Sequence, residues 1–101
     1  MNTEIIRNNG QLTVKLNGEI DHTAVSEIRK RIDSEIVRTG SMIVAFDFSG
    51  VTFMDSSGIG LVLGRYKAVS NLGGRIIIYG MSSETERIMR MSGVDKFAEI
   101  F

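Results

Sequence analysis

Cysteine is absent from the 101-residue chain, and only one histidine is present. Without cysteine the protein can form no disulfide, no thiolate zinc site and no cysteine nucleophile, a composition that suits a reducing compartment. The single histidine, His22, leaves too few ligands for the common metal sites and only one candidate base for a serine hydrolase. The composition therefore excludes cysteine enzymes and histidine-rich metal centres, and we expect no cofactor.

An excess of charge of either sign is also missing, because twelve basic residues balance twelve acidic ones. Domains that bind DNA or RNA usually carry a basic surface that displaces counterions, so nucleic acid is not an expected partner. No apolar run approaches membrane-spanning length, and residues 1–4 lack the basic start and apolar core of a signal peptide. These absences predict a cytoplasmic protein that is not inserted in a membrane.

The residues that are present fit one folded domain, residues 1–101. Hydrophobic residues make up 43% of the chain and charged residues 24%, proportions that are usual for a folded protein. The length suits one hydrophobic core, and no linker, repeat or low-complexity segment divides the sequence.

Residue periodicity predicts an α/β fold with a mixed sheet. An Asn9-Gly10 turn joins strands around residues 5–6 and 12–16 into an N-terminal hairpin. Apolar runs at 42–46 and 76–79 predict parallel strands, the first of them central, and residues 97–101 a short last strand. Helical spacing predicts one helix that ends near Thr39-Gly40 and a second that ends near residues 73–74. Their apolar positions are Val25, Ile28, Ile32 and Ile36 in the first helix, and Ile59, Val62, Leu63, Tyr66 and Val69 in the second.

A third helix is predicted after the 76–79 strand. The spacing from Ser83 to Glu86 is that of a capping box, in which serine and glutamate satisfy each other's free backbone amides. Ile88 and Met89 supply apolar contacts, and Gly93 is expected to stop the helix.

Residues 54–60, MDSSGIG, lie where the central strand meets the second helix. In open α/β sheets, ligands and partners tend to bind at such junctions. One interpretation is structural, with Asp55 or Ser56 capping the helix through a side-chain oxygen. Another is that the small neighbours leave a hydroxyl group accessible to a kinase. A phosphate loop or a hydrolase is less well supported, because no Walker lysine is present and position 54 is not the glycine of a nucleophile elbow.

A second face of this helix carries mostly small residues at three- and four-residue steps: Ser57, Gly60, Leu61, Gly64 and Ala68. Only Leu61 is expected to project from it. Small side chains let another backbone come close, either inside the domain or on a partner protein. The spacing leaves both explanations open, and the neighbouring serines favour a partner.

Several longer stretches resemble the anti-sigma factor antagonists of endospore-forming bacteria. The matching residues are 53–60 (FMDSSGIG), 63–67 (LGRYK), 16–24 (LNGEIDHTA) and 91–93 (MSG). They extend over almost the whole chain, and the LGRYK stretch favours the sporulation branch over the stress-response branch. The resemblance implies a non-enzymatic regulator with a STAS domain, in which helices pack on one side of the sheet.

The resemblance also implies a phosphorylation switch. In that family the first serine after the aspartate, here Ser56, is phosphorylated by the anti-sigma factor, which is itself a serine kinase. The unphosphorylated protein binds the nucleotide-loaded anti-sigma factor and frees the sigma factor, and a serine phosphatase resets the switch. Together with the small helix face, this predicts eight partner-binding residues: Glu19, Asp21, Asp55, Ser57, Gly58, Gly60, Leu61 and Gly64.

Members of the family usually continue into a further C-terminal helix, so apolar surface near Phe101 is expected to be exposed. Two other functions stay open at this point. One is a small nucleotide-binding or hydrolytic enzyme built on the same glycine segment. The other is a STAS-like domain that regulates a membrane transporter or a stress complex.

Overall fold

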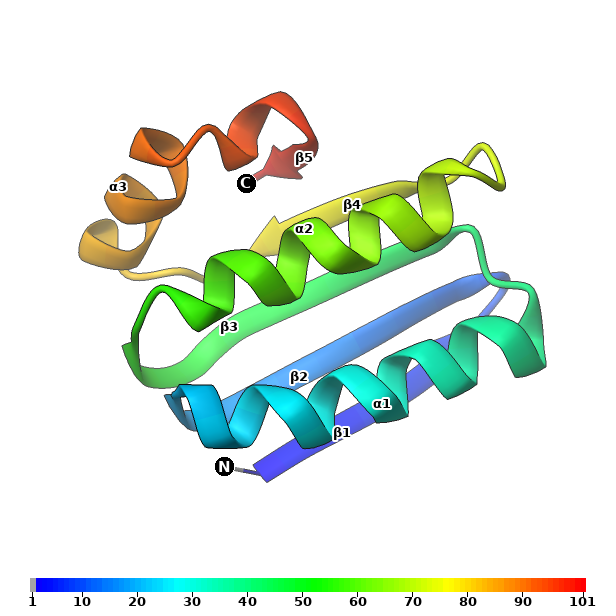
Figure 1. The fold of residues 1–101 in the computed structure, drawn as a ribbon, viewed down its shortest axis with the longest axis horizontal. Coiled ribbons are helices and arrows are strands. Elements are labelled where there is room, and N and C mark those ends of the chain that lie inside the picture. Colours follow the sequence, from blue (N-terminus) through cyan, green and yellow to red (C-terminus); the bar gives the residue numbers. More distant parts are fainter. Residues whose placement is uncertain (1) are drawn as a thin grey trace.

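A computed structural model describes residues 2–101 as five strands, three α-helices and one short 3₁₀ turn (Figure 1). The first third contains β1 (Asn2–Asn8), β2 (Gln11–Ile20) and α1 (His22–Thr39). The middle contains β3 (Ile43–Met54), α2 (Ser57–Ser70) and β4 (Arg75–Tyr79). The last part contains α3 (Ser83–Met91), η1 (Val94–Lys96) and β5 (Ala98–Ile100).

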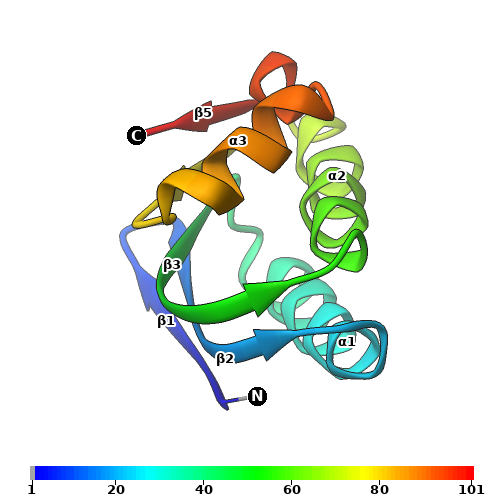
Figure 2. The same cartoon turned by 90° about the vertical axis from the view of Figure 1, so that its left-hand side faces the viewer.

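The five strands form one sheet in chain order, β1-β2-β3-β4-β5. β1 and β2 are antiparallel, whereas every later pair of neighbours is parallel. A helix joins the two strands of each parallel pair. Because the strands are added in chain order across the sheet, right-handed crossovers place all these helices on the same face. Figure 2 shows α1 and α2 lying beside each other on one side of the sheet. The predicted mixed sheet, with its hairpin and one-sided helices, is confirmed.

The turn between β1 and β2 has the predicted chemistry. Asn9 and Gly10 have φ angles of 51° and 80°, in the left-handed region that asparagine and glycine adopt most easily. The hairpin then closes with Asn8 opposite Gln11.

The core lies between the sheet and the helices. Alternate residues of β2, β3 and β4 point toward the helices, and the predicted α1 positions Ile28, Ile32 and Ile36 are buried against them. The strand residues that are at most 1% exposed on this face are Leu12, Val14, Leu16, Ile20, Val44, Phe46, Phe48, Ile76 and Ile78. As expected, Phe101 at the end of the chain is 74% exposed.

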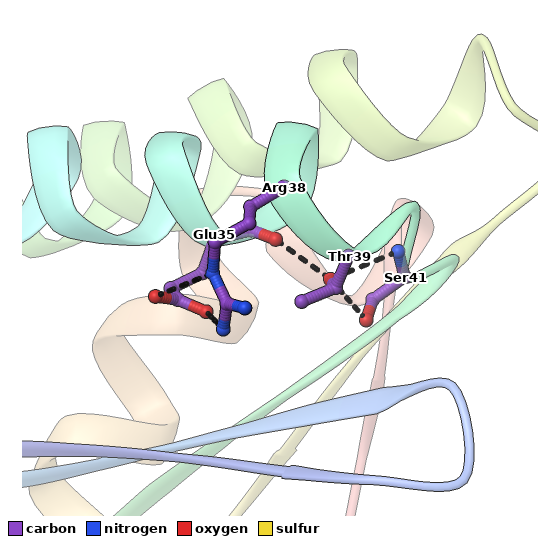
Figure 3. A network of polar contacts seen from close by, with 4 residues as sticks. All are labelled: Glu35, Arg38, Thr39 and Ser41. Carbon is purple, nitrogen blue, oxygen red and sulfur yellow. Dashed lines mark hydrogen bonds and ion pairs between the residues drawn. The ribbon is translucent and has the colours of Figure 1, made fainter.

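A polar network fixes the end of α1 where it was predicted (Figure 3). The Thr39 hydroxyl donates to the Glu35 carbonyl oxygen at 2.6 Å and accepts a hydrogen bond from the Ser41 backbone N–H at 3.2 Å. Gly40 follows in the left-handed conformation, with φ 65°, and its N–H bonds the Ile36 carbonyl. Arg38 pairs with the Glu35 side chain, and their hydrogen bond lowers the pKa of Glu35. These contacts direct the chain from α1 into β3.

β3 is longer than the predicted strand at 42–46. It continues to Met54 through a segment that is less apolar than residues 42–46, and residues 49–53 of this segment are half-buried or exposed. The last pair between β3 and β4 is Asp47 with Tyr79, so the later residues of β3 pair only with β2. Two register shifts interrupt this pairing, between Lys15 and Asn17 and between Gly18 and Glu19 of β2, and at each of them β3 has one extra residue. Such bulges increase strand twist. The ends of β2 and β3 curl toward the starts of α1 and α2 (Figure 2).

The predicted cap of α3 is wrong by one residue. The N-cap is Ser82, not Ser83, and the Ser82 hydroxyl accepts a hydrogen bond from the Thr85 N–H at 3.2 Å. Ser82 has the extended backbone of a cap, with ψ 161°. Glu86 does not close the capping box but pairs with Arg90 one turn later. Either of the two adjacent serines could have been the cap, and the backbone geometry shows that it is Ser82.

Candidate functional site

Two loops meet at one end of the sheet and form the candidate site. The Asp55 N–H donates to the Ile20 carbonyl at 3.0 Å, directly after the last register pair of β2 and β3, Ile20 with Met54. The segment that leads from β2 into α1 therefore lies against the segment that leads from β3 into α2. Figure 1 shows both helices starting at this end and running in the same direction. The predicted residues near positions 19–21 and 55–57 are brought together.

Asp55 organises the first turn of α2. Its carboxylate accepts one hydrogen bond from the Ser57 N–H, at 2.8 Å, and another from the Ser57 hydroxyl. These bonds lower the pKa of Asp55, with smaller contributions from the backbone and the imidazole of His22 at the start of α1. The structural interpretation is thus correct for Asp55, which satisfies the first amide of α2.

The lowered pKa of Asp55 predicts a pH dependence of stability. Its bonds stabilise the fold above the unfolded pKa of 3.8, and this stabilisation is lost as pH falls through the lower folded value. We expect Asp55→Ala to lower the melting temperature at neutral pH, with a smaller difference from wild type near about pH 3. Asp95→Ala, on the exposed surface of η1, is a matched control that should have little effect. Thermal melts that show the same Asp55→Ala difference at both pH values would contradict this role.

Ser56 differs from Ser57 in one decisive respect. Its side chain is exposed, and its hydroxyl group makes no hydrogen bond within residues 2–101. Only its backbone is used, because the carbonyl oxygen accepts a hydrogen bond from the Ile59 N–H at 3.1 Å. Ser57 is half-buried, and its hydroxyl is held by Asp55. The freely accessible hydroxyl of the pair is that of Ser56.

Two further acidic residues lie at the same end. Asp21 caps α1 by accepting a hydrogen bond from the Ala24 N–H at 2.8 Å, and His22 begins that helix. Glu19 is exposed and pairs in register with Phe53, an aromatic residue that is 54% exposed. Phe53 was not predicted as a site residue, although an exposed aromatic side chain is typical of binding surfaces.

The small face of α2 is only partly as predicted. Leu61 is 1% exposed and belongs to the core, so the prediction that it projects from the surface is wrong. Gly58 is also buried, and a Cβ atom there would lie 2.5 Å from Met54. Gly60 is exposed and Gly64 half-buried, and a Cβ atom on either glycine would meet nothing within 4 Å. Internal packing explains Gly58 but not Gly60 or Gly64.

The burial of Leu61 shows that the inward face of α2 is rotated from the predicted stripe. Its buried residues are Gly58, Leu61, Val62, Arg65 and Val69, whereas Ile59, Leu63 and Tyr66 are only half-buried. The rotation follows from the position of α2, which packs on α1 as well as on the sheet. Gly58 and Gly60 both lie within the regular helix α2 and not in a loop. They therefore form no phosphate-binding loop.

Comparison with known proteins decides the family. The STAS domain family model matches residues 2–101. The anti-sigma F factor antagonist of Paenibacillus polymyxa is 34% identical over 98 residues, which span 97% of this chain and 84% of the relative. This chain belongs to the STAS-domain anti-sigma factor antagonists.

Solved structures of such antagonists share the fold. The anti-sigma factor antagonist SpoIIAA in its unphosphorylated form superposes with a TM-score of 0.82 at 28% identity, covering 99% of this chain and 87% of that one. The phosphorylated form of SpoIIAA, a cell fate determinant of Bacillus, gives 0.80 at 30% identity, with 99% and 91% covered. Anti-sigma factor antagonists are regulators and not enzymes, which agrees with the prediction.

Within residues 2–101, none of the helices of this antagonist is long and apolar enough to cross a membrane. The same residues contain no group of three histidine, aspartate or glutamate side chains close enough to hold a metal ion.

Proposed function

We propose that this antagonist is switched by phosphorylation of Ser56. The unphosphorylated form binds a nucleotide-loaded anti-sigma factor and frees the sigma factor, and the anti-sigma factor, acting as a serine kinase, phosphorylates Ser56 and ends the interaction. A serine phosphatase restores the active form. The observation that carries the proposal is the exposed and unbonded Ser56 hydroxyl beside the bonded Ser57. Because transcription takes place in the cytoplasm, we also assign the protein to that compartment.

Phosphate at Ser56 is compatible with the fold. The side chain points into solvent and makes no bond that the modification would break. The positive ends of α1 and α2 lie at this end of the sheet, so their dipoles favour an added anion. The first amides of α2 are already bonded by Asp55 and Ser56, so the phosphate has no local binding site that would withdraw it from the surface. It remains where a partner must meet it.

The partner would be affected much more than the fold. Phosphate adds roughly −1.5 to −2 charges beside the carboxylates of Asp21 and Asp55. A surface that fits a small neutral hydroxyl would have to desolvate this charge and accommodate its volume.

Phosphorylation by the anti-sigma factor is expected at Ser56 alone. Ser56→Ala should abolish incorporation of phosphate, whereas Ser57→Ala should still be modified because the accessible hydroxyl is kept. Incubation with the kinase and labelled ATP, followed by phosphopeptide mapping, measures both variants. Modification that survives in Ser56→Ala and disappears in Ser57→Ala would assign the switch to the other serine.

The exposed glycine Gly60 should be part of the contact surface. Gly60→Arg should weaken binding of the anti-sigma factor about tenfold or more, because a long side chain would hold the two backbones apart. Gly60→Ala is the control: alanine favours the helix by up to about 1 kcal/mol and should leave affinity nearly unchanged. Gly60→Gln introduces a long but uncharged side chain, so it separates the effect of side-chain volume on affinity from the effect of charge. Titration calorimetry that finds Gly60→Arg and Gly60→Gln binding like wild type would remove Gly60 from the surface.

A further inference from the structure

Ser56 combines a free side chain with a firmly held backbone. Its side chain is exposed, and its hydroxyl makes no hydrogen bond within the part of the chain that the structure describes. The peptide group before its Cα atom is held by a hydrogen bond from the Gly58 N–H to the Asp55 carbonyl oxygen, at 3.1 Å. The peptide group after it is held by the bond from the Ile59 N–H to the Ser56 carbonyl oxygen. The two peptide groups that flank the Ser56 Cα atom are therefore fixed.

The side chain of Asp55 closes a turn around Ser56. One carboxylate oxygen, Oδ1, accepts both the hydrogen bond from the Ser57 N–H and the one from the Ser57 hydroxyl. This is an Asx turn, in which a side-chain oxygen bonds the backbone amide two residues later. Ser56 is the middle residue of this turn, with φ −62° and ψ −17°. The direction of its Cα–Cβ bond thus depends on the side chain of Asp55.

The turn is attached to the core on both sides. Before it, Met54 is 8% exposed and belongs to the core, and the Asp55 N–H donates to the Ile20 carbonyl oxygen of β2. After it, Gly58 is buried so closely against Met54 that a Cβ atom would lie 2.5 Å from that side chain. Ser56 therefore projects from a frame of packed and bonded residues.

Phosphoryl transfer depends strongly on the position of the accepting oxygen. The attacking and leaving oxygens must lie roughly in line with the transferred phosphorus, and catalysis consists mostly of positioning and charge stabilisation. A displacement of about 1 Å can cost about a hundredfold in rate. In the proposed reaction the antagonist is the substrate, so the position of the Ser56 hydroxyl relative to the docked surface is set by the antagonist itself.

We propose that Asp55 is a positioning residue for phosphoryl transfer to Ser56, and that it acts through the turn that it closes with Ser57. This inference rests on the proposed function. In the transfer, Ser56 Oγ bonds the γ-phosphorus of ATP, the bond from that phosphorus to the departing ADP breaks, and the hydroxyl proton passes to a base on the kinase. Asp55 is a poor acceptor for this proton, because its hydrogen bonds with Ser57 lower its pKa. Its contribution is the geometry of the turn.

Four variants separate the geometry of the turn from charge and from general stability. Asp55→Ala removes both hydrogen bonds that close the turn, and Ser57→Ala removes only the one from the hydroxyl. Asp55→Asn removes the charge but keeps an oxygen that can close the turn, since asparagine also forms Asx turns. Thr39→Val is the matched control, because it removes a hydrogen-bonded hydroxyl at the opposite end of α1.

The measurement separates the rate of transfer from affinity. Each full chain is mixed with an excess of the anti-sigma factor and saturating ATP, and single-turnover rates at increasing kinase concentration give the maximum rate. Titration calorimetry against the ADP-loaded anti-sigma factor gives the affinity. Thermal melts define a temperature at which all the variants compared are folded, and Ser57→Ala, which keeps the bond from the amide, is the milder of the two variants that weaken the turn.

Asp55→Ala should lower the maximum rate at least tenfold, with a smaller loss of affinity. Ser57→Ala should be slowed about threefold to tenfold but still be modified on Ser56, and Asp55→Asn and Thr39→Val should stay within threefold of wild type. The inference is overturned, and the proposed function stands, if the rates of Asp55→Ala and Ser57→Ala equal that of wild type or if their loss lies wholly in affinity. An equally slow Asp55→Asn or Thr39→Val also overturns it. If wild-type protein gains no phosphate on Ser56, both proposals are overturned.

Discussion

Aspartate in place of Ser56 should weaken binding of the anti-sigma factor about tenfold to a hundredfold, whereas alanine should leave the affinity close to that of wild type. A carboxylate brings negative charge and extra volume to a position where the partner meets a neutral hydroxyl, and an uncompensated charge in an interface costs several kcal/mol. It carries less charge and fewer acceptor oxygens than phosphate, so it mimics the modified state only in part.

Folding should survive both changes at Ser56. Aspartate is favourable at the start of a helix by about 0.3 to 1 kcal/mol, and alanine removes a hydroxyl that makes no hydrogen bond within residues 2–101. Ser56→Ala should also resist phosphorylation and stay permanently active. Titration calorimetry compares the three proteins, with thermal melts as the folding control. A folded Ser56→Asp variant that binds as tightly as wild type would show that charge at this position does not control binding.

The largest loss of stability is expected at the Asp33–Arg65 pair, and it should be unequal for the two partners. Asp33→Ala leaves the guanidinium of Arg65 buried without a counter-charge, which should cost about 2 to 4 kcal/mol. Arg65→Met fills the same space with an unbranched apolar chain. It leaves Asp33, which is 46% exposed, free to be hydrated, so its cost should be about 1 kcal/mol.

Urea denaturation of both variants measures this inequality. Glu35→Ala on the same helix is the control, because its pairing with Arg38 is at the surface and should contribute little to stability. If Arg65→Met is destabilised more than Asp33→Ala, this explanation is wrong. Arg65 would then stabilise the fold through the packing of its side chain and not through its ion pair with Asp33.

The sequence predicted most of the fold because its local signals agree with one another. Asn9-Gly10 specifies a hairpin turn, Ile28, Ile32 and Ile36 mark the inner face of α1, and Asp21 is a good helix cap. Each signal depends on neighbours within a few residues. The end of α1 at Thr39-Gly40 was predictable for the same reason, since glycine in the left-handed conformation stops a helix.

The predictions failed where long-range packing decides the outcome. Leu61 and Gly58 were assigned to a surface face, but both are buried, and Gly58 packs closely against Met54 of β3. Arg65 was assigned only to a family motif, because no local pattern pairs it with Asp33, thirty-two residues earlier in the chain. The difference between Ser56 and Ser57 also needed the structure, since it depends on which hydroxyl Asp55 accepts from.

The central claim is that phosphate on Ser56 ends the interaction with the anti-sigma factor, and reversible modification of the intact chain tests it most directly. Wild-type protein, phosphorylated on Ser56 by the kinase and verified by mass spectrometry, is titrated into the ADP-loaded anti-sigma factor before and after treatment with a serine phosphatase. We expect the phosphorylated protein to bind about a hundredfold more weakly, which corresponds to about 2.7 kcal/mol, and the phosphatase to restore full affinity. Equal affinities for the two forms, both folded, would contradict the account.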